Sequence, residues 1–219
     1  MVREASAAGL ELELLALRED VSFEVPALRT VVLSERVFKT VSDTVTPQGV
    51  IAIGRREPAT FAAALAAARA VGWPLLVLDG VQDPGNVGAI ARTAAAAGAP
   101  ALAVLESSAD PYGSKAVRAS AGNVFRLLVA RATPADLEGL ELWGADSEGG
   151  ESLAASPVER ADALLLGGEA RGLRAQVAHR VTIPIEAGVE SLNVAAAAAV
   201  LLFELRSRRR FNDRSPDAG

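Results

Sequence analysis

The segment PLLVLDGVQDPGNVGAIARTAAAAGAPALAVLE, residues 74–106, contains two apolar runs of strand length with a helical stretch between them. The runs are PLLVLDG and ALAVLE, and the helix is predicted from about Val87 to Ala97. Two strands joined by a helix form a βαβ unit, whose strands are parallel and whose crossover is right-handed. The pattern therefore predicts a parallel α/β sheet with helices on its faces, a fold that serves many unrelated functions.

Elements of the same kinds are predicted on both sides of this segment. An alanine-rich helix is expected from about Phe61 to Val71, because Gly72 and Pro74 follow it and end it. Later strands are predicted near Phe125–Val129, Glu141–Ala145, Ala163–Leu166 and Val181–Ile185, and a final helix from about Leu192 to Arg208.

The composition changes along the chain in a way that predicts a small domain before the large one. Short apolar runs alternate with polar breaks from Leu10 to Val50, which favours a small mixed α/β unit, and the polar stretch GRREPAT follows as a linker. We predict an N-terminal unit at residues 1–53, a linker at 54–60, the main domain at 61–211 and a flexible tail at 212–219.

The residue content limits the chemistry that the chain can perform. It has 219 residues, 50% of them hydrophobic, no cysteine and a single histidine, His179. Disulfides, thiolate metal sites and cysteine nucleophiles are excluded, and no metal site is predicted. The net charge of −5 argues against a nonspecific nucleic-acid binder. A local patch at Arg206 and Arg208–Arg210 is either a basic surface or a solvated helix end.

No apolar run is long enough to span a bilayer, because Glu204 and Arg206 interrupt the longest one. Glu4, Glu11 and Glu13 likewise break any apolar signal-peptide core. We therefore expect a cytoplasmic protein without a membrane partner.

The stretch DPGNVGAIARTAAAAGA, residues 83–99, carries the first candidate site residues. Pro84 and Gly85 are predicted to form a tight turn, with Asn86 as the N-cap of the helix that follows. Arg92 lies six residues later, about 600° around the helix axis, so loop geometry must bring Asn86 round if the two are to meet. Taken singly, Asn86 reads equally well as a plain cap and Arg92 better as a surface ion-pair residue.

Two later stretches also place polar residues between a strand and a helix. In LLLGGEARGL, residues 164–173, Gly167 and Gly168 would let a ligand approach the backbone, and Glu169 follows them. The alternative is an ordinary turn with a solvated carboxylate. In IPIEAGVESLNVAAAAAV, residues 183–200, Ser191 is predicted as the N-cap of the last helix, with Asn193 beside it.

In order, spacing and content the three stretches resemble the SPOUT superfamily, and within it the SpoU-type RNA ribose 2′-O-methyltransferases. The resemblance implies a parallel-sheet, Rossmann-like SPOUT fold with a deep C-terminal trefoil knot, and a homodimer with the active site at the subunit interface. The segment VSDTVTPQGVIAI resembles the later half of the RNA-recognition domain of rRNA-modifying members. That domain usually has more chain before this segment, so either the start of the chain was assigned late or the N-terminal unit is a shortened version of that domain.

The resemblance also assigns roles to individual residues. Asn86 and Arg92 match the family's first-motif Asn and Arg, and the Arg is the group proposed to act on the ribose hydroxyl. A guanidinium scarcely deprotonates, so positioning is a safer role for Arg92 than base catalysis. The implied catalytic set is Arg92, Asn86, Glu169, Ser191 and Asn193, and the residues implied to bind S-adenosylmethionine are Leu166, Gly167, Gly168, Ile183 and Leu192.

A fourth stretch, DPYGSKAVRASAGNVFRL, resembles the segment between motifs in rRNA-modifying relatives. Lys115, Arg118 and Ser120 are candidates for contact with RNA phosphate, and the alternative is a solvated amphipathic helix. The function predicted from the sequence is S-adenosylmethionine-dependent methylation of a ribose 2′-hydroxyl in 23S rRNA. The alternatives are a tRNA methyltransferase and a noncatalytic relative that binds RNA or cofactor.

Overall fold

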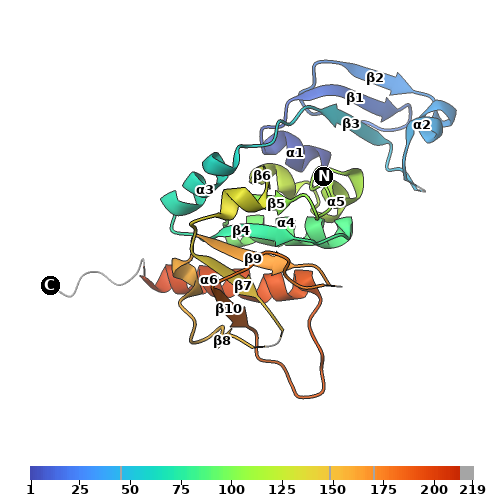
Figure 1. Ribbon diagram of the computed structural model, residues 1–219. Coiled ribbons are helices and arrows are strands. Elements are labelled where there is room, and N and C mark those ends of the chain that lie inside the picture. The colour runs from blue at the N-terminus through green and yellow to red at the C-terminus, as the bar shows by residue number, and fades with distance from the viewer. Residues whose placement is uncertain (45, 148, 170, 213–219) are drawn as a thin grey trace. The chain divides into compact units, whose positions relative to one another are not determined.

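The computed structural model describes every residue except 45, 148, 170 and 213–219 (Figure 1). The chain divides into two compact units, Met1–Glu57 and Pro58–Gly219. The predicted tail at 212–219 lies outside the described residues except for its first position.

The first unit is a mixed sheet with two short helices, α1 (Val2–Ala7) and α2 (Glu35–Val41). Its strands are β1 (Leu12–Arg18), β2 (Thr30–Leu33) and β3 (Val50–Gly54). Strand β1 is central, parallel to β2 and antiparallel to β3. Leu12, Leu15 and Leu17 of β1 are buried together with Phe38 of α2, which gives this unit a core of its own.

The second unit is built on a seven-stranded parallel sheet of order β6-β5-β4-β9-β7-β10-β8. The strands are β4 (Leu75–Asp79), β5 (Ala101–Leu105), β6 (Leu128–Ala132), β7 (Leu142–Ala145), β8 (Glu151–Ser152), β9 (Ala163–Gly167) and β10 (His179–Thr182). The helices are α3 (Phe61–Ala70), α4 (Pro84–Ala97), α5 (Ser114–Ala119) and α6 (Val194–Asn212), with 3-10 turns η1 (Asn123–Arg126), η2 (Pro134–Leu137) and η3 (Val158–Arg160).

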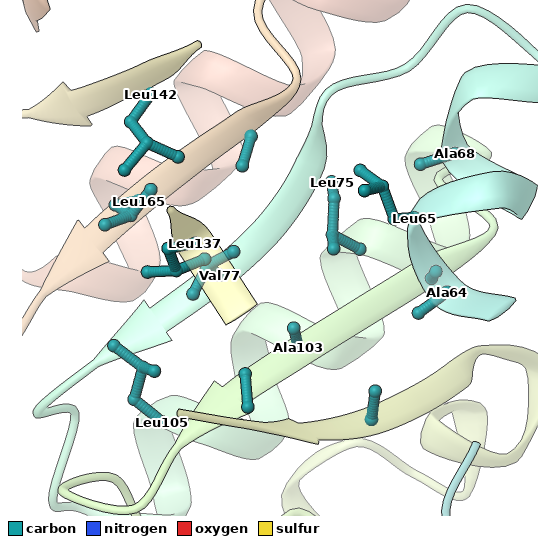
Figure 2. Close-up of a cluster of buried hydrophobic side chains, with 14 residues drawn as sticks. Ala64, Leu65, Ala68, Leu75, Val77, Ala103, Leu105, Leu137, Leu142 and Leu165 are labelled. Carbon is teal, nitrogen blue, oxygen red and sulfur yellow. The ribbon is translucent and has the colours of Figure 1, made fainter. Parts of the chain in front are cut away.

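The centre of the sheet is buried and apolar, as expected for parallel strands covered on both faces. Figure 2 shows Leu75 and Val77 of β4 among buried side chains from α3 and from neighbouring strands, including Leu65 and Leu165. Helix α4 packs against α5 and α6. The predicted parallel sheet with flanking helices is therefore confirmed.

The predicted start of α4 is wrong. Asp83 is the N-cap, its Oδ1 accepts a hydrogen bond from the Gly85 amide at 3.0 Å, and Pro84 begins the helix. Proline suits the first helical position because it has no amide hydrogen to leave unpaired, so Pro84 and Gly85 continue into the helix instead of forming a separate turn. Asn86 consequently lies in the first turn of α4.

The N-cap predicted at Ser191 is also wrong, because α6 begins at Val194. Asn193 takes that position, and its Oδ1 accepts hydrogen bonds from the Ala195 and Ala196 amides at 2.9 and 3.3 Å. Serine and asparagine cap helices about equally well, so the sequence did not distinguish the two positions. Strand β6 begins three residues later than predicted because Asn123–Arg126 forms a 3-10 turn.

Candidate active site

A cavity of about 310 Å³ lies at the carboxyl ends of β9, β7 and β10, which are neighbours in the sheet. Such a position is where open α/β sheets bind ligands. The loop after β9 and the segment between β10 and α6 complete its walls. It is lined by Ala145, Asp146, Ser147, Leu166, Gly167, Gly168, Glu169, Gly172, Leu173, Val181, Ile183, Ile185, Ser191, Leu192, Asn193, Val194, Ala197 and Leu201.

All five residues predicted to contact a cofactor, Leu166, Gly167, Gly168, Ile183 and Leu192, line this cavity. Glu169, Ser191 and Asn193 of the predicted catalytic set line it as well. The structure therefore brings the second and third sequence stretches together around one space. It does so because β9 and β10 both pair with β7, which carries their carboxyl ends to the same edge.

The sequence reasoning missed the contribution of β7. Ala145, Asp146 and Ser147 follow that strand and line the cavity, and the Asp146 carboxylate pairs with the Arg180 guanidinium of β10. Polar residues directly after a predicted parallel strand were the signal that could have revealed them.

Gly167 and Gly168 are required by the chain's own packing. A Cβ on Gly168 would lie 1.9 Å from the Gly80 carbonyl oxygen, and one on Gly167 would lie 2.3 Å from the Gly172 carbonyl carbon. Real Cβ atoms essentially never come that close to backbone atoms. The missing side chains therefore make room for neighbouring backbone, which revises the expectation that they make room for a ligand.

A chain of hydrogen bonds joins the three sequence stretches. The Asn86 Nδ2 donates to Glu169 Oε1, and the Asn193 Nδ2 donates to Asn86 Oδ1 at 3.3 Å. Asn86 reaches the other two because it lies in the first turn of α4, next to the carboxyl edge of the sheet. Its amide donates through nitrogen and accepts through oxygen, so one side chain links both loops.

Arg92 lies on α4, is exposed, and does not line the cavity. It makes no hydrogen bond or ion pair with any residue that the structure describes. The chain by itself therefore unites four members of the predicted catalytic set and gives the fifth, Arg92, no hydrogen-bond or ion-pair partner among the described residues.

The candidate RNA-contact residues differ in their surroundings. Lys115 pairs with the N-cap residue Asp83 at 2.7 Å, and this hydrogen bond is the main reason that the pKa of Asp83 lies below its ordinary value. Arg118 lies in the last turn of α5. Ser120 is buried and its hydroxyl donates to the Val117 carbonyl, so the prediction that Ser120 contacts RNA is wrong.

Within the described residues there is no group of three or more His, Cys, Asp or Glu side chains arranged to hold a metal ion. None of the helices in that part of the chain is both long and apolar enough to cross a membrane.

Residues 74–203 match the SpoU rRNA Methylase family. The chain is 35% identical, over 80% of its own length and 71% of the relative's, to the 23S rRNA (guanosine(2553)-2′-O)-methyltransferase RlmP of Bacillus subtilis. It is 40% identical to the 23S rRNA (guanosine-2′-O-)-methyltransferase RlmB of Xylella fastidiosa, over 62% of this chain and 59% of that one. A crystal structure of an AdoMet-bound rRNA methyltransferase from Sinorhizobium meliloti matches with a TM-score of 0.79 at 26% identity, over 94% of this chain and 84% of that one.

Proposed function

Because the chain belongs to the SpoU rRNA Methylase family, we propose that it transfers a methyl group from S-adenosylmethionine to a ribose 2′-hydroxyl in 23S rRNA. The observation that carries this proposal is the cavity at the carboxyl ends of β9, β7 and β10, whose loops are joined by the Asn193–Asn86–Glu169 hydrogen bonds. The names of the two relatives, both 23S rRNA 2′-O-methyltransferases, support the choice of RNA.

The cavity suits S-adenosylmethionine in size and chemistry. Its volume of about 310 Å³ falls at the lower end of the range for small-molecule sites. Leu166, Ile183 and Leu201 offer apolar surface for a purine ring, while Glu169 and Asp146 place carboxylates near a cationic ligand. Backbone groups of the two loops would fix the orientation of the cofactor, because Leu166, Gly167, Gly168, Ile183 and Leu192 all line the cavity.

The bound cofactor would supply a methyl group already activated by a positively charged sulfur. The ribose 2′-oxygen would accept that methyl group, and the hydroxyl would lose its proton to solvent. We propose that Arg92 orients the ribose and its phosphate through its exposed guanidinium. Asn86, Glu169, Ser191 and Asn193 would hold the loops that position the cofactor and the ribose, and this positioning would supply much of the rate.

The test is transfer of labelled methyl from S-adenosylmethionine to separate 23S rRNA and tRNA transcripts. We expect label in 23S rRNA that survives alkaline treatment as an uncleaved dinucleotide, because a 2′-O-methyl group blocks cleavage at that ribose. Arg92→Ala should lower transfer by at least a hundredfold and change the cofactor Kd by less than about threefold, since Arg92 does not line the cavity.

Arg160→Ala provides the matched control, because Arg160 is another exposed arginine that does not line the cavity. It should transfer methyl groups at the native rate. Label in tRNA alone would replace the 23S rRNA assignment by tRNA methylation. Cofactor binding with no label in either RNA would indicate a noncatalytic binding protein, and loss of cofactor binding in Arg92→Ala would contradict the role given to that residue.

We also propose that the chain works in the cytoplasm as a homodimer and that its C-terminal segment forms a trefoil knot. Val200 and Phe203 support the dimer, because these apolar side chains of α6 are 43% and 47% exposed.

The family membership and the fold of the second unit support the proposed knot. Mechanical stretching of the unfolded chain from its ends should leave a contour shorter than that of an unknotted 219-residue chain.

A further inference from the structure

A buried carboxylate lies next to the cavity without lining it. Asp79 is the last residue of β4 and is only 1% exposed. Burial of a carboxylate is unfavourable unless hydrogen bonds or opposite charges compensate it. Among the described residues the partners of the Asp79 side chain are two backbone amides and one hydroxyl, with no cation. Core packing alone therefore does not explain why an aspartate occupies this buried position.

The contacts of Asp79 hold both ends of one loop. Its backbone oxygen accepts a hydrogen bond from the Gly168 amide at 3.0 Å, where the chain leaves β9. Its Oδ2 accepts from the amides of Arg174 and Ala175 at 2.6 and 2.7 Å, where the loop ends. The Ser107 hydroxyl reaches the other carboxylate oxygen at 3.5 Å. One residue of β4 thus fixes the entry and the exit of the loop after β9.

The loop held in this way carries much of the candidate site. Gly168, Glu169, Gly172 and Leu173 line the cavity, and Glu169 accepts the hydrogen bond from Asn86. The Gly172 amide donates to the Gly168 carbonyl at 2.9 Å, so the loop is also closed on itself. Gly168 is already packed against Gly80, so it has no space to move toward β4. Displacement of the exit at Arg174 would therefore change the cavity wall.

We propose that Asp79 is a positioning residue, whose buried carboxylate holds the described residues of the loop after β9, 168–169 and 171–175, in the arrangement that binds S-adenosylmethionine and presents Glu169 to Asn86. The inference rests on the proposed function. Carboxylates accept charge-assisted hydrogen bonds from successive backbone amides, which are stronger than neutral ones, so the exit of the loop is held more firmly than a neutral side chain would hold it.

The test compares Asp79→Ala and Asp79→Asn with the native protein. Ser156→Ala is the matched control, because Ser156 is also buried and hydrogen-bonded, to the Leu153 carbonyl, but does not line the cavity. Hydrogen exchange of the peptide covering 168–175, the cofactor Kd by calorimetry, and methyl-transfer kcat and KM are measured well below the melting temperature of every variant.

Asp79→Ala should lose protection at Arg174 and Ala175, raise the cofactor Kd at least tenfold, and lower kcat even at saturating cofactor. Asp79→Asn should fall between native and Asp79→Ala, with the Kd raised about threefold. Its amide oxygen can still accept from both backbone amides, without the charge that strengthens those bonds, and the Ser107 hydroxyl can accept from its NH₂. The control should lower the melting temperature without changing loop exchange or Kd.

Native loop exchange and native Kd in Asp79→Ala would overturn the inference, as would an equal rise of Kd in Ser156→Ala. Failure of the native protein to bind S-adenosylmethionine would overturn the proposed function and with it the role toward the cofactor. Because hydrogen exchange needs neither cofactor nor RNA, that failure remains distinguishable from a failure of Asp79 to hold the loop.

Discussion

At the scale of single residues, contacts with the backbone determine which substitutions the cavity wall tolerates. Gly168 and Gly80 touch through backbone atoms only, and a side chain at 168 has no flexible neighbour that could move aside. Gly144 differs, because a Cβ there would lie 2.2 Å from the end of the Leu173 side chain, a flexible group that could move and that is part of the cavity wall. The requirement for glycine set by backbone packing therefore applies to Gly168 and not to Gly144.

Gly168→Ala is expected to lower the free energy of unfolding by about 1–3 kcal/mol, because the added methyl group must displace backbone in a packed region. The displaced loop should also bind S-adenosylmethionine at least tenfold more weakly. Chemical denaturation and calorimetry measure the two effects.

Gly113→Ala is the control, since its φ is −60° and the nearest atom to an added Cβ is 3.2 Å away, at the Asp110 carbonyl. It should change cofactor affinity by less than twofold. A Gly168→Ala protein with native stability and affinity would show that the loop adjusts without cost.

At the scale of elements, Asp162 connects α3 to the strands next to it. Its Oδ2 accepts from the Glu141 amide at 3.0 Å, and its Oδ1 accepts from the Arg69 guanidinium of α3 at 2.8 Å. The pKa of Asp162 is lowered, first by the backbone hydrogen bond from Glu141 and further by Arg69, against the opposing effect of burial.

A carboxyl group whose pKa is lower in the folded state than in the unfolded state stabilises the fold above its ordinary pKa. That contribution is lost as the pH falls through the lower, folded-state value. Asp162→Ala should therefore cost about 1–2 kcal/mol at pH 7, where three hydrogen bonds to a charged group are removed, one from the Glu141 amide and two from the Arg69 guanidinium. The difference from native should shrink steadily between about pH 5 and pH 3 in urea denaturation curves. A difference that stays constant over this range would contradict the assignment.

Much of the second unit could be predicted from the sequence because its elements are strongly patterned. The apolar runs at 75–79 and 101–105 are completely buried strands, and the alanine-rich stretch at 61–70 is a helix. The boundaries of the elements were harder to predict. Asp83 and Asn86 are both suitable N-cap residues for α4, and Ser191 and Asn193 are both suitable for α6.

Within the site, the local sequence was enough to predict the residues on the loops after β9 and β10. It was not enough to predict contacts between residues that lie far apart in the chain. Asp79 and Arg174 are 95 positions apart, and no periodicity indicates that a strand-end carboxylate will accept from that amide. Asp146 was missed because the position of β7 between β9 and β10 is a property of strand order, which the pattern of apolar residues does not contain.

At the scale of the whole molecule, the exposed apolar face of α6 yields a prediction about assembly. Phe203→Glu should convert the proposed homodimer to a monomer in sedimentation equilibrium, because a carboxylate buried in an apolar interface is strongly unfavourable. Methyl transfer should fall with it, since the resemblance to the SpoU family implies a site at the subunit interface.

Val71→Glu is the control, since Val71 is an exposed apolar residue of similar exposure, 42%, at the end of α3. It should leave the association state and activity unchanged. A native chain that sediments as a monomer at all concentrations would remove the homodimer from the proposal.

The position of the cavity along the chain has a consequence for protein synthesis. Among the described residues its lining begins at Ala145 and ends at Leu201, so the described part of residues 1–144, which is made earlier, contributes nothing to its walls. Five of the seven strands of the large sheet are synthesised before β9 and the loop that follows it, and α6 is the last of the described elements to be synthesised. A nascent chain therefore cannot hold S-adenosylmethionine until α6 has been made, and ribosome-bound chains stalled before Val194 should not retain it.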